Sequence, residues 1–327
     1  MIELHRHHGG SLTTKWVWET LKRQPTDINR PILCEGQVES LMTFKHGEQR
    51  TFPNFLSKFS ILDQIVWDEE TIRDSIDNVC WGIKSERLQY AELKVSLHKF
   101  MRQTKLPPVD LVRIIREKLN DFHNTWGVGF GLVLSIKYEA DRNEQRKIAS
   151  LITDKAAEHL VGIDFVGDEF YYDPDFYEGI CREWKSAGKG VEAHVGESQT
   201  HENVRSAIEL LKVNRIAHGI RAISHPDIIK LAVDHNVCFD MALTSNYYTG
   251  VAEYETHPIR ELLESRIVPI TLGTDDPVVL NTTLDNEYML AKKYYNLSDD
   301  DITWLVFNSI RFAFGWKAMT NRFVMED

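Results

Sequence analysis

The sequence lacks any long apolar run. No stretch approaches the roughly 18 consecutive apolar residues that a membrane-spanning helix needs. Glu3 and His5 interrupt the start of the chain, and no apolar segment of a secretory signal follows them. We therefore expect a cytoplasmic protein that has no membrane partner.

Cysteine is scarce, and none of the four cysteines lies in a CxxC pair. This spacing gives no sign of a disulfide framework or of a cysteine-based zinc site. It also matches no recognisable signature of a cysteine nucleophile. We expect four reduced and mostly buried thiols, at Cys34, Cys80, Cys181 and Cys238.

Positive charge is in deficit, because 38 Lys and Arg face 49 Asp and Glu, which gives a net charge of −11. An acidic chain argues against polymeric nucleic acid or an anionic membrane as the main partner. One small anionic ligand stays compatible with it, since a few local cations could hold such a ligand. The 327 residues are 43% hydrophobic and 27% charged, as in ordinary globular proteins.

Eight short segments have the composition of buried strands, being apolar or β-branched along most of their length. They are Ile2–His7, Leu88–Leu97, Val128–Tyr138, Leu160–Glu169, Gly190–Glu197, Arg215–Gly219, Val237–Ser245 and Ile267–Asp275. Apolar residues at helical spacing fill most connections, at Arg142–His159, Asp173–Ser186, His201–Val213 and His225–His235. This alternation predicts an α/β fold, a (β/α)8 TIM barrel formed by one domain over residues 1–327. A last helix, Ser298–Phe314, should close it.

The connection after the first predicted strand is too long for a simple crossover. It spans about residues 11–87 and holds three helical segments, Ser11–Lys22, Phe52–Val66 and Glu69–Leu88. Loops that follow barrel strands build the C-terminal mouth, so we expect this helical insertion to lie over that mouth. Its apolar side chains either line a lid or form only the packed face of a helix: Phe52, Phe55, Leu56 and Phe59.

Side chains that bind metals gather at the ends of four predicted strands. The stretches are His5-Arg6-His7, His194-Val195-Gly196-Glu197, His218-Gly219 and Thr274-Asp275-Asp276-Pro277. Because the carboxyl ends of barrel strands converge on one pocket, residues from opposite ends of the chain can share one ion. Three imidazoles and a carboxylate form an ordinary ligand set for one Zn2+. A glutamate, a histidine and an aspartate remain for acid–base work and substrate binding.

The spacing within the first two stretches fits a shared site. His5 and His7 are two apart, so in a strand they face the same side. His194 and Glu197 are three apart, and they share a side only if the chain turns at Gly196.

Each stretch also has a simpler explanation. The N-terminal histidines could be a tag remnant, and His218 could be a buried histidine with satisfied hydrogen bonds. Asp275 or Asp276 could cap a helix that begins at Pro277. One metal accounts for all four stretches together, so we predict a metal site.

The same blocks resemble those of the adenosine deaminase family, within the metal-dependent hydrolase superfamily. The resemblance runs from Ile2 to about Phe314. It includes the metal stretches and three further blocks, Asn54-Phe55-Leu56-Ser57-Lys58-Phe59, Gly167-Asp168-Glu169 and Thr244-Ser245-Asn246. It implies zinc-dependent hydrolytic deamination of the 6-amino group of adenosine or a 5′-modified adenine nucleoside, with release of ammonia and an inosine-type product.

The resemblance assigns the metal and the reaction chemistry. One Zn2+ per chain would be held by His5, His7, His194 and Asp275. Glu197 would share a proton with N1 of the purine, and His218 would be the base or the orienting group for the attacking water. Asp275 would also serve the reaction as a catalytic residue. A protonated Glu197 suits the chemistry, because N1 gains electron density when C6 becomes tetrahedral.

The resemblance also assigns substrate contacts. Asp276 would bind N7 of the purine, the backbone of Gly167 would approach N3, and His7 would lie beside the substrate. The partner would be a small purine nucleoside, while the sequence leaves the oligomeric state open. Binuclear members of the superfamily bridge two metals with a carboxylated lysine late in strand 4, and Asp164–Gly167 contains no lysine, which supports a single ion. The PCxxC signature of base-flipping zinc deaminases is also absent.

One departure from the family concerns the sugar side of the substrate. The family's N-terminal block reads HxHLDG, and its acidic residue, which binds the 5′-hydroxyl of ribose, is replaced here by Gly9. The change leaves room and removes a repelling charge. We therefore expect an adenine nucleoside with a bulky or anionic 5′-substituent, such as aminodeoxyfutalosine, 5′-methylthioadenosine or S-adenosylhomocysteine.

Other functions remain open at this point. Within the same chemistry, the alternatives are an adenine deaminase or an N6-substituted AMP deaminase. A hydrolase of another bond, such as a phosphoester or a lactone, is less favoured, because Glu197 and Asp276 suit N1 and N7 of a purine. A catalytically inactive binding protein on the same fold is less favoured too, since every ligand and Glu197 are retained.

Overall fold

The computed structural model describes residues 1–24, 34–155, 158 and 160–315. Eight parallel strands lie side by side in sequence order. They are β1 (Ile2–His7), β2 (Tyr90–Ser96), β3 (Gly129–Lys137), β4 (Leu160–Val166), β5 (Gly190–Val195), β6 (Arg215–His218), β7 (Cys238–Met241) and β8 (Ile270–Leu272). Hydrogen bonds from His7 N to Asp275 O (2.9 Å) and from Asp275 N to His5 O (2.7 Å) join β1 to the segment after β8. The predicted TIM barrel is confirmed.

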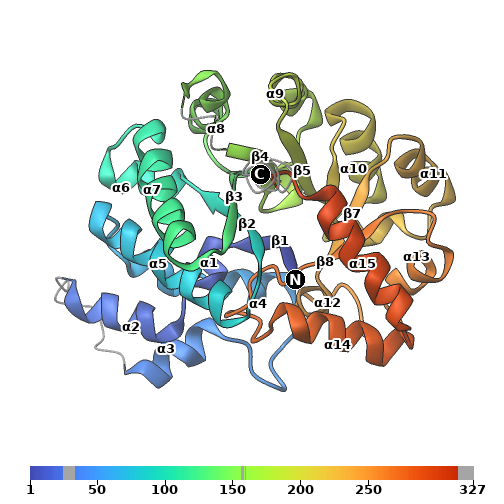
Figure 1. Cartoon of the computed structure of the whole chain (residues 1–327), viewed down its shortest axis with the longest axis horizontal. Coiled ribbons are helices and arrows are strands. Elements are labelled where there is room, and N and C mark those ends of the chain that lie inside the picture. The colour runs from blue at the N-terminus through green and yellow to red at the C-terminus, as the bar shows by residue number, and fades with distance from the viewer. Residues whose placement is uncertain (25–33, 156–157, 159, 316–327) are drawn as a thin grey trace, which may run out of the picture.

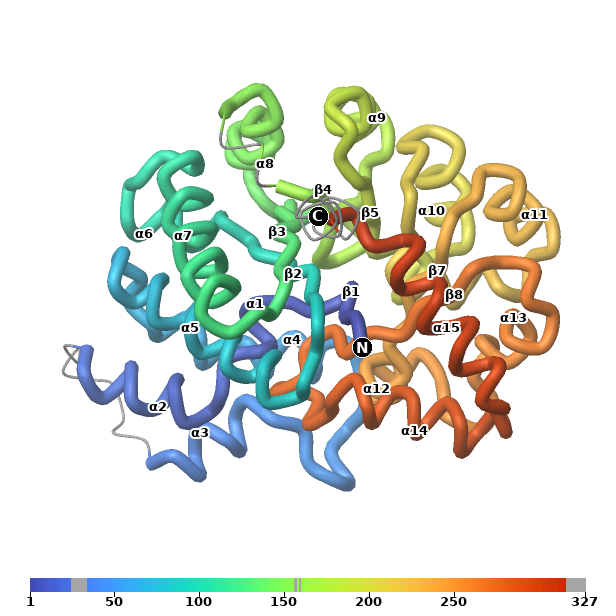
Figure 2. Tube along the Cα trace, in the orientation of Figure 1, coloured from blue at the N-terminus to red at the C-terminus, as the bar shows by residue number. Residues whose placement is uncertain are grey.

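Helices surround the strands, and α6 to α11 follow one another around the ring in chain order (Figures 1 and 2). Those after β2 are α6 (His98–Thr104), α7 (Pro108–Trp126), α8 (Arg142–Ala149), α9 (Pro174–Ser186), α10 (His201–Ser206), α11 (Pro226–Asp234), α12 (Leu243–Tyr248), α13 (Ile259–Ser265), α14 (Leu284–Tyr295) and α15 (Asp299–Phe312). The final helix, α15, packs against β8 and β1. No described helix has both the length and the apolarity to cross a membrane.

The segment that forms α7 is not among the predicted helices. Its sequence nevertheless explains why it is helical. Pro108 stands at the first helical position, where its missing N–H costs nothing. Apolar side chains recur at spacings of three and four and are buried: Leu111, Val112, Ile114, Ile115, Leu119 and Phe122. Gly127 ends the helix with φ +71°, a left-handed conformation that glycine adopts without strain.

The helical insertion after β1 lies over the carboxyl ends of the strands, as predicted. It contains α1 (His8–Ser11), α2 (Thr14–Arg23), α3 (Glu35–Met42), α4 (Phe52–Ser57), a 3-10 turn at Ser60–Gln64, and α5 (Glu69–Ser85). Phe44 N donates to Val279 O (2.8 Å), and Arg50 pairs with Glu253 (2.7 Å). These two partners follow β8 and β7, so the insertion contacts the loops at the mouth of the barrel.

Several predicted strands are too long. The strand predicted at Val237–Ser245 ends at Met241, and the chain then enters α12, which carries Thr244, Ser245 and Asn246. The apolar pattern misled because strand and helix are both buried there. The eighth strand, predicted at Ile267–Asp275, is confined to β8.

Two glycines end strands early. The strand predicted at Leu160–Glu169 ends at Val166, before Gly167 with φ +105°. The strand predicted at Gly190–Glu197 ends at Val195, before Gly196 with φ +69°, which confirms the turn that the spacing of His194 and Glu197 required.

Two predicted helices are also shorter than expected. The one predicted at Arg142–His159 ends as α8, and a 3-10 turn follows at Ser150–Thr153; residues 156, 157 and 159 lie outside the described part. The helix predicted at His201–Val213 changes at Ala207 into a short π-helix.

All four thiols are free, and three of them are buried, as the sequence suggested. Cys80, Cys181 and Cys238 lie in the interior, whereas Cys34 is exposed. Burial raises the pKa of the three buried thiols.

Candidate active site

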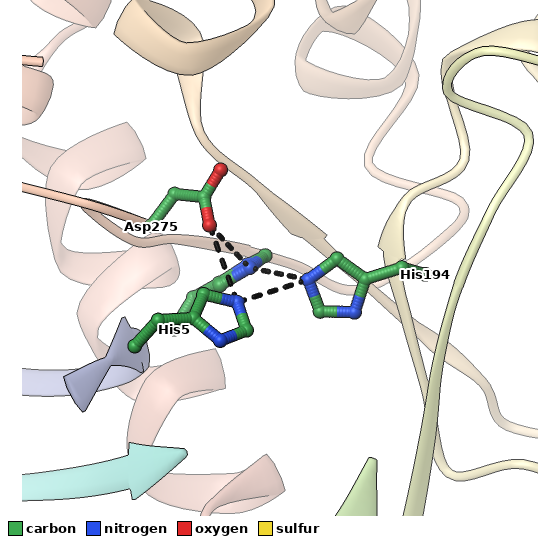
Figure 3. Close-up of side chains that lie close together, drawn as sticks. His5, His194 and Asp275 are labelled. Atoms are coloured by element: carbon green, nitrogen blue, oxygen red, sulfur yellow. Dashed lines mark hydrogen bonds and ion pairs between the residues drawn. The ribbon is translucent and has the colours of Figure 1, made fainter. Parts of the chain in front are cut away.

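Four predicted ligands converge at the mouth of the barrel. His194 Nε2 lies 3.0 Å from His5 Nε2 and 3.2 Å from His7 Nε2, and Asp275 Oδ1 lies 3.3 Å from each of the latter two. One donor atom from each of the four residues lies within 4.8 Å of the others. Figure 3 shows His5, His194 and Asp275 pointing toward one another. Chain segments from both ends of the sequence therefore supply one cluster.

The chemistry of this donor set fits a metal ion. Burial lowers the pKa of His5 to about 3 and also lowers the pKa of His7, so both rings stay neutral, as metal ligands must be. Burial disfavours a charged Asp275, but the neighbouring His5 and His7 hold its pKa well below the ordinary value. Three imidazoles with one carboxylate match the kinds of ligand that catalytic zinc sites use.

Two of the predicted ligands are held by contacts that the sequence reasoning missed. Asp164, on β4, places Oδ1 3.1 Å from His194 Nδ1. Ser245, on α12, donates from Oγ to Asp275 Oδ2 at 2.7 Å. Such partners fix the orientation of metal ligands. A signal for Asp164 was present in the sequence, since it is the one charged residue within the otherwise apolar stretch Leu160–Val166.

A buried charge network lies inside the barrel and includes Asp164. Lys94 Nζ is 3.2 Å from Asp164 Oδ2 and 3.0 Å from Glu192 Oε2. Arg215 binds Glu92 and Glu192 at 2.6 and 2.8 Å. Buried charges of this kind need good partners, because an unpaired one is very costly. The network thus links Asp164, and through it His194, to strands on other sides of the barrel.

Glu197 lies beside the ligand cluster in a loop held by Glu169. The carboxylate of Glu169 accepts the backbone N–H groups of Gly196 (2.7 Å), Glu197 (2.8 Å) and Ser198 (2.7 Å). Glu197 itself is 7% exposed, and burial, with Asp275 nearby, raises its carboxyl pKa well above the ordinary value. A carboxyl group with a raised pKa is suited to act as an acid.

His218 faces the same space as Glu197. Its Nε2 is 3.7 Å from Glu197 Oε2 and 3.9 Å from Asp275 Oδ2. Burial lowers the pKa of His218 well below the ordinary value, so the ring is neutral. Its other nitrogen, Nδ1, lies 3.0 Å from Asn246 Nδ2. The sequence alone gives Asn246 no role beyond its place in the block Thr244-Ser245-Asn246.

Asp276 occupies space that Gly10 leaves free. A Cβ atom built on Gly10 would lie 1.8 Å from Asp276 Oδ1. That oxygen is buried and has no hydrogen-bond partner among the described residues. Burial, with Asp275 alongside, raises the pKa of Asp276 well above the ordinary value. An unpartnered polar atom beside the cluster is suited to a ligand contact.

Gly167 lies at the end of β4, in the loop that carries Glu169. Its φ of +105° suits glycine, and a Cβ atom there would lie 2.2 Å from Glu139 Oε2. No described contact joins Gly167 directly to the ligand cluster. The carboxylate of Glu169 ties its loop to the loop that carries Glu197.

Two site residues have unusual backbones. His218 and Asp275 have φ values of +64° and +60°, which are uncommon for residues other than glycine. Such conformations persist where surrounding contacts impose them, and they gather at functional sites. Nothing in the sequence pattern signals either value.

Comparison with known proteins agrees with this geometry. A profile of the adenosine deaminase family matches residues 1–324. An adenosine deaminase from Shewanella denitrificans is 28% identical over 318 residues, covering 96% of this chain and 94% of that protein. Two solved structures share the fold: an amidohydrolase from Burkholderia ambifaria with bound Zn (TM-score 0.84, 20% identity, 97% and 88% coverage), and an Arabidopsis N6-mAMP deaminase (TM-score 0.84, 19% identity, 98% and 95% coverage).

Proposed function

This chain belongs to the adenosine deaminase family of hydrolases that act on C–N bonds, and we propose that it uses one Zn2+ to deaminate a 5′-modified adenine nucleoside. The convergence of His5, His7, His194 and Asp275 beside the buried Glu197 carries the proposal. These four side chains would hold the ion. When bound, Zn2+ supplies a Lewis acid that lowers the pKa of water and so favours its attack.

The remaining site residues act on the purine. Glu197, kept protonated by burial, donates to N1 as C6 becomes tetrahedral, so it binds the transition state more tightly than the substrate. Asp276 directs its unpartnered Oδ1 toward N7 of the purine. The backbone of Gly167 approaches N3. His7 and Asp275 lie at the edge of the reaction centre, on the side of the metal. His218 contacts the attacking water.

The surroundings of Gly9 bear on the substrate. A Cβ atom on Gly9 would meet only Leu62 Cδ1 at 3.6 Å and Phe59 Cδ1 at 4.0 Å, so a Cβ atom could be placed there without a clash. Both neighbours are apolar and belong to the insertion. In the segment beside them, Lys58 is already paired with Glu48. These features favour an uncharged, apolar 5′-substituent over a phosphate, with the insertion serving as the lid.

A substrate panel tests the proposal. Zinc-loaded protein is given adenosine, 5′-methylthioadenosine, S-adenosylhomocysteine, AMP, N6-methyl-AMP and adenine, and both ammonia release and loss of adenine absorbance are followed. We expect 5′-methylthioadenosine to have the highest kcat/KM and a chelator to abolish turnover. Failure of every compound would overturn the proposed deamination, whereas preference for AMP or N6-methyl-AMP would overturn only the substrate assignment.

Substitution of Gly9 tests the substrate assignment separately. Gly9→Asp restores the acidic residue of the family block, so it should raise kcat/KM for adenosine relative to 5′-methylthioadenosine by about tenfold, the value of one good hydrogen bond. Gly9→Ala adds a methyl group without charge and is the matched control. Equal preferences in the two variants would show that Gly9 does not set the 5′ specificity.

A further inference from the structure

Three buried side chains form a hydrogen-bonded row that ends at the reaction centre. His218 ends β6, Asn246 lies on α12, and His257 precedes α13. Their exposed fractions are 1%, 0% and 2%. Since water does not reach them, each polar atom must find its partner within the protein.

The direction of the row is fixed at its far end. The backbone N–H of Ile259 donates to His257 Nδ1 at 3.1 Å, and a backbone N–H can only donate. Nδ1 of His257 is therefore the acceptor. A neutral imidazole carries one proton, so that proton is on Nε2. Burial lowers the pKa of His257 to about 3, which keeps the ring neutral.

The same direction continues through Asn246. His257 Nε2–H faces Asn246 Oδ1 at 3.1 Å, so this oxygen accepts. The amide nitrogen then points the other way and donates to His218 Nδ1 at 3.0 Å. If the amide were turned over, its NH2 group would face the N–H of His257, and two buried donors would oppose each other.

We propose that His257 and Asn246 are positioning residues that hold His218 as the tautomer with its proton on Nε2, so that a donor faces the reaction centre. The catalytic meaning rests on the proposed deamination. The Nε2 atom of His218 lies 3.7 Å from Glu197 Oε2 and 3.9 Å from Asp275 Oδ2. It therefore faces the space that both carboxyl groups border. An N–H at this position donates a hydrogen bond to a lone pair of the attacking water, and it cannot accept the water's proton. Of the two roles that the resemblance offered for His218, the row selects the orienting group over the base.

Asn246→Asp should reverse the direction of the hydrogen bond to His218, and it changes the volume of the side chain little. A carboxylate only accepts, so it draws the His218 proton to Nδ1 and leaves Nε2 without its donor unless the ring becomes charged. We expect kcat to fall roughly 10⁴-fold, the effect known for a wrong histidine tautomer in catalysis, while KM changes less than about threefold. His257→Phe frees the amide to turn, and kcat should fall by about tenfold to a hundredfold.

A matched variant separates this effect from the cost of a buried charge. Asn308 is 2% exposed and donates from Nδ2 to Ile270 O at 3.0 Å, away from the row. Asn308→Asp should lower the thermal midpoint as much as Asn246→Asp does, yet leave kcat within about threefold of wild type. Zinc content is measured in each variant and should stay near one ion per chain.

The tautomer itself can be observed without any substrate. Neutron crystallography of the deuterated wild-type protein should place deuterium on His218 Nε2 and on His257 Nε2, and Asn246→Asp should move the former to Nδ1 or add a second. Deuterium on His218 Nδ1 in the wild type, or wild-type kcat in Asn246→Asp, would overturn the inference. If the wild type deaminates none of the adenine compounds, the proposed function fails. The neutron map still decides the direction of the hydrogen bonds in the row and the tautomer of His218.

Discussion

Glu169 and Glu197 are joined through the backbone, with Glu169 Oε1 2.8 Å from Glu197 N. The same carboxylate accepts the neighbouring N–H groups of Gly196 and Ser198. Three backbone donors on one buried anion fix the turn after β5, and this turn directs the Glu197 side chain toward the cluster. The geometry of Glu197 thus depends on a carboxylate 28 residues earlier in the chain.

Glu169→Gln should weaken this turn. A glutamine offers one acceptor and one NH2 group, so at least one of the three N–H groups faces a donor and loses its bond. We expect the free energy of unfolding to fall by about 2 kcal/mol and kcat to fall at least tenfold. Urea unfolding and steady-state kinetics measure the two effects. Glu117→Gln, which alters an exposed ion pair with Arg73, should change neither appreciably; equal effects in the two variants would contradict the assignment.

The adjacent glycines Gly9 and Gly10 should respond differently to alanine. A Cβ atom on Gly10 would overlap Asp276 Oδ1 at 1.8 Å, whereas one on Gly9 would meet nothing closer than 3.6 Å. Gly10→Ala should displace Asp276 and lower kcat/KM by roughly a hundredfold, a loss that a 1 Å misplacement can cause. Gly9→Ala should retain most of the activity.

Gly36→Ala is the control for the effect of a glycine-to-alanine change on stability. Nothing lies within 4 Å of a Cβ atom on Gly36, which is inside α3, so alanine there should raise stability by about 0.5–1 kcal/mol. Activity of Gly10→Ala close to that of Gly9→Ala would show that Asp276 is not needed where the structure holds it.

The strands and the ligand cluster were predictable because they depend on local patterns. Parallel strands buried on both faces read as continuous apolar runs, and β1 was predicted with its observed bounds. Barrel strands end at one mouth, so His5 and Asp275 were expected to meet there, whereas the choice of the four predicted ligands came from the family resemblance. Strand ends were less predictable, as at Leu243, where an apolar residue is buried in a helix instead of a strand.

The contacts that orient the site were not predictable, because they join segments that only the folded barrel brings together. His257 is distant in sequence from His218, and its role depends on one backbone N–H. Likewise, the sequence alone gives Glu169 no role, since its partners are backbone groups that carry no side-chain signal. The left-handed backbone of Asp275 also follows from its surroundings, because aspartate rarely adopts it alone.

Acid should destabilise the protein partly through His98. Burial lowers its pKa to about 4, whereas the unfolded value is 6.5. Between these values the unfolded chain binds a proton that the folded protein does not, so stability present above about pH 6.5 is lost as pH falls toward 4. Lys137 N–H donates to His98 Nε2 at 3.3 Å, which also favours the neutral ring.

The variant His98→Gln should therefore lose less stability on acidification. From about pH 7 to about pH 5, the free energy of unfolding should fall by about 2 kcal/mol less than in wild type. Urea titrations at a series of pH values measure this difference. The exposed His46 gives the control His46→Gln, which should follow the wild-type curve. Parallel curves for His98→Gln and wild type would contradict the pKa assigned to His98.

Asp164 should influence metal affinity without binding the metal. It accepts from His194 Nδ1 at 3.1 Å and pairs with Lys94 at 3.2 Å. Asp164→Asn removes the charge that orients His194 and leaves Lys94 with Glu192 as its remaining close anion. Competition with a chelator should show zinc affinity reduced by roughly 10- to 100-fold, the usual effect of removing such a partner.

Turnover at saturating zinc separates a loss of affinity from a damaged active site in Asp164→Asn. Because the ligands and Glu197 are unchanged, kcat at saturating zinc should stay within about tenfold of wild type, and most of the loss should appear only at limiting zinc. Asp63→Asn, at an exposed pair with Lys99, is the control and should bind zinc as wild type does. Unchanged zinc affinity in Asp164→Asn would mean that His194 is held in place by packing alone, and that the buried charge network serves only the barrel.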